Sequence, residues 1–167
     1  DDEIDENTAV HEISKNIITS KNSNIKIQDP KHGRCNLISC VDGIIVFQQN
    51  QLFSINSVTN DIGIASLQAF SKVKKNQVIT SIKAIPFGIK KKYIQNIINI
   101  SQDCFKILPF QKKNIHLIQT TNYNTRGKIL EKTLAVTKDR LSSCGINTIV
   151  EKKCSHEIKS LCAQLKK

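Results

Sequence analysis

Short apolar runs alternate with amphipathic stretches over residues 115–165, and this alternation constrains the fold more than any other feature. The two runs have the length and apolar character of buried strands: Ile115, Leu117 and Ile118 in the first, and residues 146–150 in the second. Between them, residues 127–144 place apolar side chains at helical spacing, and Gly145 follows where a left-handed cap would end a helix. This order predicts two adjacent parallel strands joined by a crossover helix.

A second helix is expected after the second run. Ser155 can cap it, and apolar residues recur along it with the spacing of one helical face: Ile158, Leu161, Cys162 and Leu165. Residues 109–167 are therefore interpreted as a βαβα half-domain. Its exposed strand edge should be covered by another copy of the chain or by a neighbouring lobe.

The residues before Pro109 predict a small α+β lobe over 32–108, preceded by a helix and linker over 1–31. The first helix should cover residues 1–18, with five acidic residues in its first turns, where the helix dipole favours negative charge. Within the lobe, strands are expected at 44–47, 62–64 and 78–85, and helices near 52–55 and over 91–105. The whole chain is predicted to be α/β.

The chain carries 25 Lys and Arg against 14 Asp and Glu, a formal net charge of +11. Nucleic-acid binding is nevertheless disfavoured, because the excess is mostly Lys in small clusters without interleaved aromatic residues. Lys, Ile and Asn share A- and T-rich codons, so a biased genome explains much of this charge. No apolar run approaches the roughly 20 residues of a membrane span, so no membrane contact is expected and a cytoplasmic location is the default.

Six cysteines are present, but their spacing favours neither zinc nor disulfides. There is no C-x-x-C pair, and the four histidines do not fall at zinc-finger spacing. The cysteines are therefore interpreted as free thiols in a reducing compartment, with Cys144 and Cys162 on buried helix faces, and no metal is expected. Cys154 and His156 could form a reactive pair, although no third group to orient them is evident.

The turn between the first run and the helix is the candidate binding site. Thr120, Thr121 and Asn122 follow the first strand, at the edge where open α/β sheets place ligands. The free amides at Gly127, with Lys128 beside them, can bind a phosphate. Two plainer readings stay open: the glycine can serve turn chemistry, and Glu131 can pair with the helix dipole.

The positions Gly127, Ile129, Glu131, Thr133 and Gly145 resemble the first βα unit of the molybdopterin-binding domain shared by molybdenum-cofactor biosynthesis enzymes. Three upstream segments resemble the region that precedes this domain in bacterial proteins that also carry a nucleotidyltransferase-like half: residues 33–37, 56–64 and 78–87. Three positions depart from the family pattern. Asp is usual at 131, Asn is usual at 133, and a Thr-Gly pair is usual where this chain has Thr120-Thr121.

The resemblance implies a three-layer α/β domain, of which residues 109–167 form the first part, and a phosphorylated pterin, molybdopterin, as the substrate-like ligand. The ligand-binding residues it implies lie in the turn and the first helical turns: Thr120, Thr121, Asn122, Gly127, Lys128, Glu131 and Thr133. The chain would then be a molybdopterin-binding module of a molybdenum-cofactor biosynthesis protein, with a transferase as the parent. Alone it is expected to be inactive, because the family's later strands and glycine-rich loop would lie after Lys167. Contact with a downstream domain or with another copy is expected. The alternative is a non-catalytic binding or scaffold domain.

Overall fold

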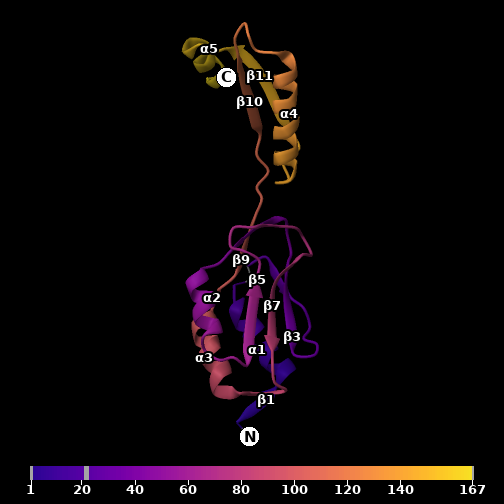
Figure 1. The fold of residues 1–167 in the computed structure, drawn as a ribbon, viewed down its shortest axis with the longest axis vertical. Helices are drawn as coiled ribbons and strands as arrows, with labels where there is room; N and C mark the ends of the chain where they lie inside the picture. Colours follow the sequence, from indigo (N-terminus) through magenta and orange to yellow (C-terminus); the bar gives the residue numbers. More distant parts are fainter. Residues whose placement is uncertain (1, 21–22, 167) are drawn as a thin grey trace. The chain divides into compact units, whose positions relative to one another are not determined.

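The computed structural model describes residues 2–20 and 23–166, and the chain divides into two compact units (Figure 1). Unit 1 is Asp1–Pro109 and unit 2 is Phe110–Lys167. Both contain helices and strands, so the α/β class predicted from the sequence is confirmed. Residues 1–31 do not form a separate part, because their helix packs into unit 1. Among the described residues, no helix combines the length and the apolar character needed to cross a membrane.

The strands of unit 1 form antiparallel sheets. One sheet has the order β2-β3-β7-β5, with these bounds: β2 Ile25–Ile27, β3 Arg34–Ser39, β7 Val78–Ala84 and β5 Ile62–Ser66. A second has the order β6-β4-β9: β6 Lys72–Val73, β4 Gly43–Val46 and β9 Lys106–Pro109. A short pair joins β1, Glu3–Asp5, to β8, Gly88–Lys90. The strands expected near 44–47, 62–64 and 78–85 are therefore present.

Three helices complete unit 1: α1 (Glu6–Ile17), α2 (Gln49–Asn56) and α3 (Lys91–Ser101). The buried face of α1 lies against β3, β7 and α3. Within the core, the ring centroids of Phe47 and Phe105 lie 5.0 Å apart. The helix predicted over 91–105 ends at Ser101, because Gln102 leaves the helical conformation and Asp103 adopts φ +50°.

The helix predicted over residues 1–18 begins later than expected. Glu3 to Asp5 instead form β1, and the Asp5 carboxylate accepts hydrogen bonds from the amides of Asn7 at 3.1 Å and Thr8 at 3.0 Å. An extended Asp with these bonds is an N-cap, so it ends the strand and starts α1 at Glu6. The acidic residues before Glu6 therefore lie outside the helix, and Asp1 lies outside the described residues.

Unit 2 has the predicted order: β10 (Ile115–Thr121), α4 (Gly127–Ser142), β11 (Ile149–Ser155) and α5 (Ile158–Leu165). The parallel pairing of β10 with β11 is confirmed, with register from Ile115↔Ile149 to Thr121↔Ser155. The second strand was predicted at 146–150 and begins later. Ile146 is used to end α4, since its amide donates to the Leu141 carbonyl at 3.0 Å while Gly145 adopts φ +75°.

The last helix differs from its prediction. Ser155 is the final residue of β11, and the N-cap of α5 is Glu157. Ile158 and Leu165 are 83% and 68% exposed, and Cys162 is exposed, so the predicted apolar face is not buried. In Figure 1, α4 and α5 lie on opposite sides of the β10–β11 pair. A sheet of two strands covers only a narrow face of each helix, which leaves the outer apolar positions of α5 in contact with solvent.

Candidate functional site

The candidate site lies where β10 and β11 end. Because the strands are parallel and in register, Thr120 lies opposite Cys154 and Thr121 opposite Ser155. The next residue, His156, stays attached to the first strand, since its amide donates to the Thr121 carbonyl at 2.9 Å. Hydroxyl, imidazole and backbone groups therefore meet at one edge, the edge where open α/β sheets bind ligands.

His156 is a site residue that the sequence interpretation did not assign to the ligand. Its Nδ1 lies 2.9 Å from the Thr120 hydroxyl oxygen, so the two groups form a hydrogen bond. The imidazole tautomer decides which of them donates. The ring is exposed and open to a ligand. A signal was present in the sequence, because a residue that follows the second of two parallel strands reaches the same edge as the residues that follow the first.

The structure does not join Cys154 and His156 into a reactive pair. The His156 imidazole bonds instead to the Thr120 hydroxyl, with 2.9 Å between Nδ1 and the hydroxyl oxygen. Elsewhere, burial raises the pKa of the Cys35 thiol, and it raises the pKa of Cys104 to about 11. Both buried thiols are therefore protonated at neutral pH and poor nucleophiles.

Asn122 builds the turn that follows β10. Its side-chain oxygen accepts from the Asn124 amide at 3.0 Å and from the Thr125 hydroxyl at 2.9 Å. The Asn122 amide donates to the Thr125 hydroxyl oxygen at 3.0 Å. This is the local turn chemistry typical of Asn, so the Asn122 oxygen shapes the loop and only its NH₂ group is left for a ligand.

Gly127 starts α4 without any conformational need for glycine. The preceding residue, Arg126, makes no side-chain cap hydrogen bond. Gly127 is not at positive φ, and an added Cβ would meet no atom within 4 Å. The side-chain position of Gly127 is therefore empty, while the nearby Ile129 amide donates to the Arg126 carbonyl at 3.0 Å.

The other predicted residues lie along α4. Lys128 is exposed and contributes, with Lys132 and Arg140, to a shallow hollow of about 630 Å³ on one face of the helix. Glu131 is exposed and forms no ion pair with any described residue. The Thr133 hydroxyl donates to the Ile129 carbonyl at 2.9 Å, within its own helix. Thr120 and Thr121 thus share an edge with His156, whereas Glu131 and Thr133 lie further along the helix.

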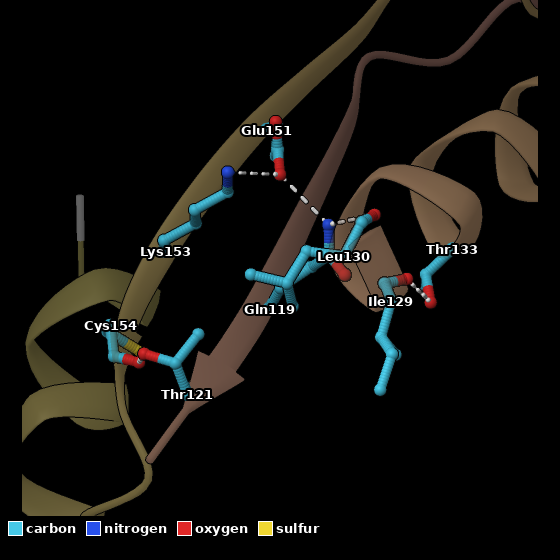
Figure 2. A network of polar contacts seen from close by, with 8 residues as sticks. All are labelled: Gln119, Thr121, Ile129, Leu130, Thr133, Glu151, Lys153 and Cys154. Carbon is cyan, nitrogen blue, oxygen red and sulfur yellow. Dashed lines mark hydrogen bonds and ion pairs between the residues drawn. The ribbon is translucent and has the colours of Figure 1, made fainter. Parts of the chain in front are cut away.

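Gln119 ties the helix to both strands, as Figure 2 shows. Its side-chain nitrogen donates to the Leu130 carbonyl at 3.1 Å and to a Glu151 carboxylate oxygen at 2.9 Å. Lys153 lies 3.4 Å from the same oxygen. Gln119 is 7% exposed, so this amide holds α4 against the sheet from an almost buried position. These bonds link the first turn of α4 to both strands.

Within the described residues, no group of three or more His, Cys, Asp or Glu side chains could hold a metal ion. The ends of β10 and β11 form a polar edge of hydroxyl, imidazole and backbone groups. Comparisons of the chain with family models, with curated proteins and with solved structures found no match.

Proposed function

We propose that unit 2 binds a phosphorylated pterin of the molybdopterin type, as a module of a molybdenum-cofactor biosynthesis protein. The observation that carries the proposal is the parallel pairing of β10 and β11, which brings Thr120, Thr121 and His156 to one edge. The identity of the ligand rests on the resemblance in residues 127–145. Unit 2 would form the first part of the three-layer domain of that family.

The chemistry of this edge suits a pterin phosphate. The Thr hydroxyls and the His156 imidazole can donate to or accept from the polar edges of a pterin ring. The open start of α4 can receive the phosphate, and the positive charge of Lys128 lies beside it. Gly127 supports this assignment, because the fold leaves its side-chain position empty and a bulky residue would block close approach.

Binding by this edge alone should be weak. A helix N-terminus contributes about 0.3–1 kcal/mol to an exposed anion, whereas micromolar affinity requires roughly 8 kcal/mol. We therefore expect this chain to bind a phosphorylated pterin with millimolar affinity and to catalyse no reaction.

The test is an NMR titration of the whole chain with neopterin monophosphate, a stable phosphorylated pterin. Amide shifts are expected at Thr121, His156 and Gly127, with smaller shifts from unphosphorylated neopterin. Gly127→Val should weaken binding by up to about fivefold, because its branched side chain would occupy the empty space beside the helix start and the helix start contributes at most about 1 kcal/mol. Ala135→Val is the control, since it places the same side chain on an exposed position of α4, away from the edge. Unchanged affinity of a folded Gly127→Val protein would refute the role of the helix start, and micromolar binding elsewhere would refute the placement.

The second candidate is a scaffold domain without a pterin ligand. It is favoured by the exposure of Ile158 and Leu165 on α5 and of Tyr123, which is 96% exposed. Such side chains are typical of protein contacts. Self-association in sedimentation that Ile158→Lys abolishes, together with no response to neopterin monophosphate, would favour this candidate over the first.

A further inference from the structure

The sheet β2-β3-β7-β5 of unit 1 has one face toward the core and one face open. Its inward residues are apolar and buried, as Leu37, Ile64 and Ile82 are, and α1 packs against β3 and β7. In Figure 1, α1 lies behind β5 and β7. The alternate residues point the other way and are exposed: Arg34 on β3, Gly63 on β5 and Lys83 on β7.

The strand register gathers positive charge at one end of this open face. Arg34 pairs with Lys83, and Lys83 pairs with Gly63, so the three residues form one row across three strands. Two like charges directly opposite each other destabilise a sheet. Neither the Arg34 nor the Lys83 side chain has a hydrogen-bond or ion-pair partner among the residues that the structure describes. The row is thus an uncompensated pair of cations, which an anion would neutralise.

A groove of about 460 Å³ adjoins this pair. Its floor is made of small residues, Gly63, Ala65 and Ser81, and its rim includes Thr59 and Asn60. Gly63 is not at positive φ, and an added Cβ would meet no atom within 4 Å. Glycine weakens a strand interior and often marks a site where a ligand or another backbone comes close to the sheet, and the open space at Gly63 leaves room for one.

The edge of this sheet is closed to an added strand at the groove. Asn56 donates through its side-chain nitrogen to the Ile64 carbonyl at 2.9 Å and accepts from the Ile64 amide at 2.9 Å. These bonds occupy the backbone groups of β5 that an extended peptide would need. A peptide bound by strand addition is therefore a poor occupant, and two cations are too few for a nucleic-acid stripe.

We propose that this groove binds a phosphorylated small molecule of about nucleotide size. The phosphate lies between Arg34 and Lys83, where the guanidinium offers two parallel donors and the ammonium a point charge. The rest of the ligand lies over Gly63 and Ala65, and its polar groups face Thr59 and Asn60. The volume agrees with ligand pockets, which are typically about 300–1,000 Å³. This site is separate from the pterin edge and does not depend on it.

Titration of the whole chain with AMP, followed by amide NMR shifts, tests the proposal. Shifts are expected at Arg34, Gly63 and Lys83, with weaker binding of inorganic phosphate and of adenosine. The double variant Arg34→Gln/Lys83→Gln should lose at least tenfold in affinity. Its control, Lys75→Gln/Lys106→Gln, makes the same charge change at exposed positions outside the groove and should lose less than twofold.

A second variant tests the shape of the groove independently of charge. Gly63→Val adds bulk to the floor without a clash and raises strand propensity, so the protein should fold and lose AMP binding at least fivefold. Equal losses in both double variants would show a general charge effect and overturn the site. Unchanged affinity of Gly63→Val, or tighter binding of a poly-glutamate peptide or an oligonucleotide at the same residues, would also overturn it.

Discussion

The two units of this chain are held together in different ways. Unit 1 has a continuous apolar core that α1, α3 and the sheets share, from Ala9 to Ile107. In the described part of unit 2, the single residue that is buried is polar, Gln119, and neither α4 nor α5 contains a buried residue. Unit 1 is thus stabilised mainly by apolar burial, whereas unit 2 depends on strand pairing, helix caps and one amide network.

The cause of this difference lies in the number of elements that cover each sheet. A helix over a sheet of several strands can bury a full apolar stripe, as α1 does with Val10, Ile13 and Ile17. A two-stranded sheet is marginal without further packing. Unit 2 accordingly leaves Ile129 and Ile158 largely exposed, and these positions would gain most from a partner.

The largest expected effect comes from the core of unit 1. Phe105 is 1% exposed, so Phe105→Ala should destabilise unit 1 by about 3–5 kcal/mol. Leu134→Ala, at a half-buried position of α4, should cost less than about 2 kcal/mol, because folding removes less apolar side-chain area from water at this position than at Phe105. Urea unfolding followed by amide signals of each unit measures both. Equal losses of unfolding free energy in the two variants would show that unit 2 has an apolar core of its own. The two units would then be stabilised in the same way.

A smaller effect is expected at the end of α4. Gly145→Ala should destabilise unit 2 by about 1–2 kcal/mol, because an alanine at φ +75° has a Cβ clash with its own backbone. Gly127→Ala is the matched control and should cost nothing, since its conformation is open to any residue. Thermal unfolding of unit 2 compares them. A neutral Gly145→Ala would mean that the cap does not limit the stability of this unit.

The amide network should contribute about 1 kcal/mol. Gln119→Leu removes the bonds to Leu130 and Glu151 while keeping the volume, so unit 2 should lose roughly 0.5–1.5 kcal/mol. Hydrogen exchange should rise at the first turns of α4, which this side chain holds against the sheet. Gln111→Leu, at an exposed position, is the control. Unchanged exchange in α4 would show that the network does not position the helix.

The smallest expected effect is on the stability of unit 1 at acidic pH. Hydrogen bonds from the Thr8 hydroxyl and amide lower the pKa of Asp5 below 3.8, and bonds from Thr19 and Ser20 lower the pKa of Asp103. A lowered folded-state pKa means that the stabilisation is present above pH 3.8 and is lost as the pH falls through the folded value. Asp5→Asn/Asp103→Asn should therefore flatten the acid limb of unit 1 stability, measured by urea unfolding between pH 6 and pH 2. If the double variant loses stability with falling pH as the unchanged protein does, groups other than Asp5 and Asp103 cause the acid sensitivity of unit 1.

Several elements of the fold were predictable because their signals are local. Gly145 marks the end of α4, and the apolar runs on either side of that helix are sufficient to predict a parallel strand pair. The turn residues Thr120 to Asn122 and Gly127 were likewise found from their place after the first strand. Their assignment to a pterin ligand stays a prediction.

The features that the sequence did not reveal depend on segments far apart in the chain. Glu3 to Asp5 became a strand because Gly88–Lys90 lies beside it, and His156 reached Thr120 because two strands align in register. The cation pair of Arg34 and Lys83 likewise exists only through the pairing of β3 with β7. Local patterns determine helices, caps and the type of each strand, because they depend on neighbouring dihedral angles and side-chain spacing. Which side chains become buried or meet at a site is decided by tertiary pairing, because that depends on which surfaces exclude water together.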